Sequence, residues 1–158
     1  MKTRIVFTLS ICLFLAAACT PAPAATPAPA AVSNSWQTYS NPAGFSIRYP
    51  ATWTKEEVPQ QAGETIQTVS LKGPEGGVDL HWGVGFGGAC PQGYTTVKVA
   101  EGELPTCYSK NADGTELWAQ IGKQLATTSF SADARTNNAE PASHELVLQV
   151  LSTLSFPK

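Results

Sequence analysis

The clearest pattern along the chain is a strict alternation of hydrophobic and polar positions over residues 78–86. The polar face carries Asp79, His81 and glycines. A period of two sustained over this length indicates a half-buried β-strand rather than a helix. Its apolar face is formed by Val78, Leu80, Trp82, Val84 and Phe86.

Shorter alternations of the same kind occur on both sides of this segment and are bounded by proline, glycine, asparagine or aspartate. Asp113-Gly114 is the strongest turn signal, because an Asp-Gly pair suits a tight hairpin. We therefore predict a hairpin around it. The further predicted strands cover residues 45–49, 65–72, 95–100, 104–109, 115–122 and 124–132.

The hydrophobic period changes near the end of the chain, over residues 140–153. Apolar positions now recur at helical spacing, and Pro141 stands where the first turn of a helix accepts proline. The stripe consists of Leu146, Val147, Val150, Leu151 and Leu154. The expected fold class is α+β, with an antiparallel sheet of six or seven strands packed with at least one C-terminal helix.

The N-terminus has the pattern of an export signal. Lys2 and Arg4 precede an apolar run over residues 5–15, which is too short to span a bilayer. Ala16-Ala17-Ala18-Cys19 resembles the lipobox of bacterial lipoproteins, and this resemblance implies removal of a signal peptide, residues 1–18, and lipidation of Cys19. An ordinary secretory signal with a chance cysteine is the alternative.

A spacer follows, because residues 20–32 alternate proline with alanine and threonine and are expected to form an extended polyproline-like segment. The predicted organisation is residues 19–35 as lipidated cysteine and linker, then residues 36–158 as one globular domain. The expected location is the cell membrane or outer membrane, on its extracytoplasmic side.

Charge excludes one class of partner. Loss of Lys2 and Arg4 with the signal leaves eight basic and twelve acidic residues, a net charge of −4. A domain of this sign does not attract nucleic acid. The expected contacts are instead the membrane, through the lipid, and a protein or envelope partner.

Two cysteines remain in the globular domain, Cys90 and Cys107. Oxidation is the default outside the cytosol, so we predict a disulfide, which would close a loop of about 18 residues. Free thiols are one alternative. A metal site that adds His81 is another, although a zinc-type ligand spacing is missing.

Catalytic and cofactor motifs are weak. Residues 83–88 satisfy G-x-G-x-x-G, but no helical pattern follows, as a dinucleotide site requires. Asp79 and His81 share one strand face and could form a general-base pair. A recognisable nucleophile motif does not accompany them, so we expect no catalytic residues, no cofactor and a structural histidine. We expect His144 to be solvated.

The aromatic residues include candidates for ligand contact. Trp82 should lie in the core and Trp53 should fold back over the sheet, whereas Trp36 and Trp118 could be exposed or packed. Together with Asp79 and His81, Trp118 is a candidate ligand-binding residue. The acidic residues Glu56, Glu57 and Glu64 lack a calcium-loop pattern and indicate a solvated loop.

Residues 36–53, with Gly-Phe-Ser, then Tyr-Pro-x-x-Trp, resemble the opening of PsbP-like domains. Residues 152–156, Ser-Thr-Leu-Ser-Phe, are similar to the end of that family. The resemblance implies an antiparallel sheet between helices, an α/β/α sandwich. It carries over no functional residues, and analogy of fold is a weak guide to function.

The sequence therefore predicts a lipid-anchored extracytoplasmic binding or accessory protein, not an enzyme, that engages a protein partner or an envelope component. The alternative is a small-ligand carrier that uses the strand face of Asp79 and His81. A hydrolase that uses His81 is a third hypothesis.

Overall fold

The computed structural model describes residues 35–60, 62–85 and 87–156. Every described residue belongs to one compact unit of the chain. The predicted signal peptide, the lipidation site Cys19 and the linker as far as residue 34 lie outside the described residues.

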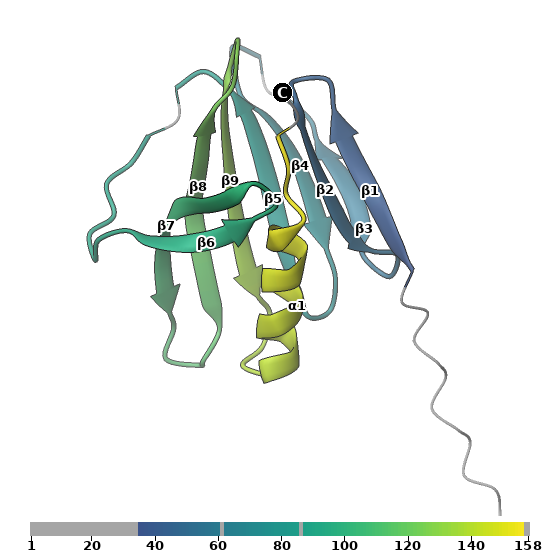
Figure 1. Cartoon of the computed structure of the whole chain (residues 1–158), viewed down its shortest axis with the longest axis vertical. Helices are drawn as coiled ribbons and strands as arrows, with labels where there is room; N and C mark the ends of the chain where they lie inside the picture. The colour runs from purple at the N-terminus through teal and green to yellow at the C-terminus, as the bar shows by residue number, and fades with distance from the viewer. Residues whose placement is uncertain (1–34, 61, 86, 157–158) are drawn as a thin grey trace, which may run out of the picture. The chain divides into compact units, whose positions relative to one another are not determined.

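The described residues form nine strands and one helix (Figure 1). Seven strands make one antiparallel sheet in the order β3-β4-β5-β9-β8-β7-β6, and β1 and β2 pair separately. The strands are β1 (Trp36–Asn41), β2 (Phe45–Pro50), β3 (Thr54–Val58), β4 (Gln67–Lys72), β5 (Gly76–Gly83), β6 (Thr95–Val99), β7 (Gly102–Lys110), β8 (Glu116–Gln124) and β9 (Ser129–Thr136).

The helix α1 (Pro141–Ser152) packs on one face of the large sheet and contacts β2, β5, β6 and β9 (Figure 1). Pro141 opens the helix as predicted, and the predicted stripe supplies the buried Val147, Val150 and Leu151. After the helix, Ser155 pairs with Ser46 of β2, which joins the two-stranded sheet to the C-terminal segment. The predicted α+β class, with an antiparallel sheet and a C-terminal helix, is confirmed.

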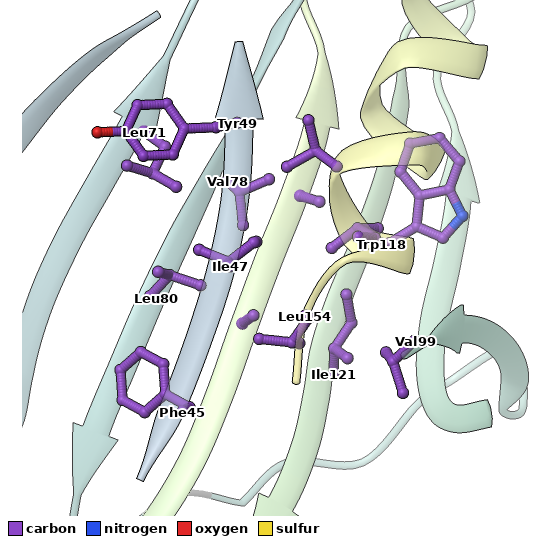
Figure 2. Close-up of a cluster of buried hydrophobic side chains, with 14 of the residues drawn as sticks. Phe45, Ile47, Tyr49, Leu71, Val78, Leu80, Val99, Trp118, Ile121 and Leu154 are labelled. Carbon is purple, nitrogen blue, oxygen red and sulfur yellow. The ribbon is translucent and has the colours of Figure 1, made fainter. Parts of the chain in front are cut away.

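The core lies between this face of the large sheet, the helix and the small sheet (Figure 2). Alternate residues of β2 and β5 point into it, and Leu154, after the helix, completes it from above the sheet. Phe45 packs on Phe130 with ring centroids 4.7 Å apart. Trp53 is also buried, as expected. Burial of these apolar side chains is the main force that stabilises the fold.

The bounds of every predicted strand shift by one or more residues in the structure, and for two strands the physical cause of the shift is clear. The strand predicted for residues 78–86 is β5 and ends at Gly83, where φ is +149° and a Cβ would lie 2.2 Å from the carbonyl oxygen of Thr65. Val84 is consequently 59 % exposed, and Phe86 lies outside the described residues. The strand predicted for residues 124–132 is β9, which begins later because Leu125 N–H bonds the Thr128 carbonyl and closes a turn.

The second face of the large sheet is polar. It presents hydroxyl and charged side chains from β4, β5 and β9, because residues of a strand alternate between the two faces. These side chains include Thr68, Ser70, Asp79, His81, Ser131, Asp133 and Arg135. Among the described residues, none of the helical structure is long and apolar enough to cross a membrane.

Candidate functional site

A cleft of about 720 Å³ opens on the polar face of the sheet. We call it the sheet cleft. Its floor comes from β5, β8 and β9, and one wall comes from the glycine-rich segment that follows β5. Its lining includes His81, Gly88, Tyr94, Gln120, Lys123 and Asp133. This volume is within the range of about 300–1,000 Å³ typical of small-molecule sites.

A disulfide fixes the wall of the sheet cleft. Cys90 lies in the glycine-rich segment and Cys107 in β7, with their Cα atoms 5.4 Å apart, so the predicted pair is confirmed. Tyr94 follows in the same segment, and its hydroxyl donates to the Gly88 carbonyl at 3.0 Å. The wall is therefore held both covalently and by a side-chain hydrogen bond.

His81 lies on the floor of the sheet cleft and has a partner on each side. Its Nδ1 is 2.9 Å from the hydroxyl oxygen of Thr68 in β4. Its Nε2 is 3.5 Å from Oδ2 of Asp133 in β9. The side chain is 23 % exposed. The imidazole thus links three neighbouring strands across the polar face.

Asp133 is the second ionisable group of the floor. The hydrogen bond from the imidazole of His81 lowers the pKa of this carboxyl group, and burial raises it. The hydrogen bond from the backbone N–H of Gln120 lowers the pKa further. That N–H donates to Oδ1 at 2.8 Å. Asp133 is therefore ionised over the physiological range, and each of its carboxylate oxygens faces a group of the floor.

Gln120 has an unusual backbone. Among the described residues, it is the one non-glycine residue with positive φ, at 57°. It stands at the β-bulge of β8, where the register with β9 shifts between Trp118 and Ile121. A Cβ on Gly88 would lie 2.4 Å from Nε2 of Gln120, so the wall approaches the glutamine side chain closely. Strained residues at bulges are frequent beside binding sites.

Asp79 shares the polar face with His81, as predicted, but does not line the sheet cleft. Its Oδ2 accepts a hydrogen bond from Arg135 Nη1 at 2.6 Å, and its Oδ1 accepts one from Ser70 Oγ at 2.5 Å. The carboxylate is therefore engaged by neighbouring strands. The predicted pair of Asp79 and His81 is replaced by two separate networks.

The candidate Trp118 needs a correction, because it is only 5 % exposed. Its ring packs between Tyr108 and His144, at centroid distances of 5.6 and 5.5 Å, on the helix side of the sheet. A ligand at the surface does not reach it. The physical reason is the strand alternation of β8, which turns Trp118 and Glu116 toward α1.

His144 is not simply solvated, since its Nδ1 donates to the carboxylate of the buried Glu116. Tyr108 and Lys110 also donate to Glu116, at 2.7 and 3.3 Å. Burial raises the pKa of Glu116, but the hydrogen bonds from His144, Tyr108 and Lys110 outweigh it and lower the pKa to about 2. This cluster attaches the helix to the sheet.

The residues that the sequence did not reveal are Asp133, Gln120 and Tyr94. Asp133 stands between two alanines in β9. This short alternation is the one sequence signal that could have placed its side chain on the polar face. Within the parts of the chain that the structure describes, three or more His, Cys, Asp or Glu side chains do not gather in a metal-binding arrangement. What the sheet cleft offers to a ligand is hydrogen bonding and aromatic contact.

Comparison with known proteins adds little. No protein-family model matches the chain, and no curated protein matches it. A crystal structure from Bacteroides thetaiotaomicron VPI-5482 is similar, with 16 % sequence identity and a TM-score of 0.43. The match covers 77 % of this chain and 48 % of that one, so this chain spans less than half of that protein's length.

Proposed function

We propose that this chain is a lipid-anchored extracytoplasmic binding protein that takes up a small polar ligand in the sheet cleft and does not convert it. The single observation that supports this function is the cleft itself, a concave site whose wall is fixed by a disulfide and whose floor carries a paired histidine and carboxylate. The PsbP-like resemblance belongs to the same proposal and concerns the scaffold rather than the site.

Binding is favoured over hydrolysis by the contacts of His81. A general base must present one ring nitrogen to a nucleophile or a substrate. Here Nδ1 contacts Thr68 and Nε2 faces Asp133. Thr68, whose hydroxyl is the one bonded to the ring, does not line the sheet cleft. The arrangement stabilises the floor and presents no activated nucleophile to a ligand.

A protein partner, the other hypothesis drawn from the sequence, stays a prediction. Exposed Val84 and Tyr94 belong to the segment that forms the cleft wall. They would be the first residues to test in crosslinking from native membranes.

The proposal is tested by screening neutral and charged small polar molecules against the purified chain in detergent micelles. A ligand at 100 times its Kd stabilises the folded state by about 2.7 kcal/mol, which raises the melting temperature by several degrees. Gly87→Trp fills the sheet cleft from a position with no heavy atom near its Cβ, and should abolish the shift.

Ala112→Trp is the matched control, because it adds the same side chain to an exposed turn that does not line the cleft. It should retain the shift. A ligand that stabilises both variants equally would place binding elsewhere. Turnover of that ligand by the unaltered chain, lost in His81→Ala, would show an enzyme and overturn the proposal.

A further inference from the structure

We infer that the ligand of the sheet cleft is a neutral saccharide, recognised by stacking on Tyr94 and by hydrogen bonds to Gln120 and Asp133. This inference rests on the proposed function and adds the chemical class of the ligand. It is carried by the charge balance of the cleft, the exposed aromatic ring on its wall and the amide group on its floor.

The carboxylate and the ammonium in the described lining of the sheet cleft, Asp133 and Lys123, are opposite in charge. The carboxylate of Asp133 faces the imidazole of His81 across 3.5 Å. Lys123 is the lysine of the described lining. Its ammonium lies 4.4 Å from the ring centroid of Phe156, which belongs to the core. The described lining thus holds one carboxylate and one ammonium, so an anionic or cationic ligand would find no excess of complementary charge to offset its desolvation.

An aromatic ring is available on the wall. Tyr94 is 60 % exposed and lines the sheet cleft, and its hydroxyl is already bonded to the Gly88 carbonyl. That bond fixes the ring without using its faces. A rigid aromatic face prefers flat or ring-shaped partners with apolar patches, and costs little conformational entropy on binding. The axial C–H face of a sugar ring meets this requirement.

Hydrogen-bonding groups suited to hydroxyls lie on the floor. Within the described residues, the side-chain amide of Gln120 forms no hydrogen bond, although Gly88 lies against it. An amide offers both a donor and an acceptor, and each sugar hydroxyl is likewise both. The side chain of Asp133 is 40 % exposed, and its carboxylate adds a charged acceptor. Neutral hydroxyls satisfy these groups without adding charge.

Titration of the full-length ¹⁵N-labelled chain in micelles with maltotriose and with chitotriose tests the inference. Saturable shifts of the Gly88, Tyr94 and Gln120 amides by either neutral trisaccharide are expected. Trigalacturonate, which has the same size but carries carboxylates, should bind at least about tenfold more weakly.

Variants separate the two recognition elements. Tyr94→Ala should weaken binding by about tenfold or more, whereas Tyr94→Phe should stay within about twofold, because stacking and not the hydroxyl is used. Gln120→Gly should weaken binding by a similar factor, and glycine adopts the positive φ of this position without strain. Val84→Ala, at an exposed position of the same segment outside the cleft lining, is the matched control and should bind normally.

The outcomes distinguish this inference from the proposed function. Shifts of the same amides by another small molecule, but by neither neutral trisaccharide, would overturn the saccharide class and leave the binding function in place. Equal binding by Tyr94→Ala, or tighter binding of trigalacturonate, would also overturn it. If none of the screened small molecules perturbs the cleft, the proposed function fails as well.

Discussion

The backbone N–H of Gln120 donates a hydrogen bond to the carboxylate of Asp133 at 2.8 Å, at the bulge where the register of β8 with β9 shifts. Gln120 makes this bond with φ at 57°, a left-handed conformation that costs a residue with a Cβ roughly 1–2 kcal/mol. The same bond lowers the pKa of Asp133. Local strain and the electrostatics of the cleft floor are therefore coupled at one position.

Substitution of Gln120 should reveal this strain. Gln120→Gly relieves the left-handed penalty and raises the entropy of the unfolded chain, so its free energy of unfolding should stay within about 1 kcal/mol of the original. Gln120→Val, which is β-branched, should be less stable than Gln120→Gly by about 1–2 kcal/mol. Urea unfolding measures both, and a valine variant as stable as the glycine variant would contradict the strain.

Close packing at Gly76 gives a sharper prediction for the core. A Cβ there would lie 2.3 Å from the backbone carbonyl oxygen of Arg135 and 2.6 Å from Val147 of the helix. Backbone atoms of a paired strand cannot move aside cheaply, so Gly76→Ala should lower the free energy of unfolding by about 2–3 kcal/mol.

Gly87→Ala is the matched control for this substitution, because no heavy atom lies within 4 Å of its Cβ. It should change stability by less than about 0.5 kcal/mol. Equal effects of the two substitutions would mean that β5, β9 and the helix are not packed as the structure describes.

The disulfide makes a separate contribution. Cys90 and Cys107 are separated by 17 positions, and a closed loop of this length stabilises the fold by about 3 kcal/mol in the chain-entropy model. Replacement of both cysteines by serine should lower the urea midpoint accordingly. A reductant should lower the midpoint of the original chain and leave that of the double variant unchanged. A reductant effect on the double variant would point to a different cause.

The cluster around Glu116 predicts the response to acid. Its pKa is about 2 in the folded state and near 4.5 without partners, so Glu116 stabilises the fold above pH 4.5 and loses this contribution as the pH falls toward 2. The contribution is about 3 kcal/mol. Glu116→Gln should lose it at pH 7 and show a weaker decline of stability between pH 4.5 and 2, measured by urea unfolding.

Glu56→Gln is the control for the acid prediction. Glu56 forms an exposed ion pair with Lys72 at 2.9 Å, and such surface pairs contribute at most about 1 kcal/mol. This variant should keep the acid response of the original chain. If Glu116→Gln also keeps it, another group controls acid unfolding.

The sequence predicted those elements whose signal is local. The helix at Pro141 and the hairpin at Asp113-Gly114 are specified by neighbouring residues, and both form as expected. Strand β3 escaped prediction because Thr54–Val58 is an exposed edge strand with charged residues and no apolar alternation. Strand β9 was displaced because its inward residues Ala132 and Ala134 are small and give a weak pattern.

The sheet cleft could be predicted from the sequence less well than the fold, because it depends on contacts between distant segments. The alternation of β5 correctly placed His81 on the polar face, but its partners Thr68 and Asp133 are set by strand order and register. Gln120 required knowledge of the bulge in β8. Trp118 could be read as exposed or packed, and only the position of the helix decides that it is buried.

The last prediction concerns Cys19, the site of the lipid anchor that we propose. A diacylglycerol attached to its sulfur supplies two acyl chains, and two chains hold a protein on a bilayer where a single chain binds it only reversibly. Radiolabelled palmitate should therefore be incorporated into the original chain, which should sediment with membranes. Cys19→Ser should abolish the label and release the protein. Cys12→Ser, which alters a thiol of the segment expected to be removed, is the control and should keep both. A label that survives Cys19→Ser would contradict lipidation at Cys19, and an original chain that takes up no label would show export without a lipid.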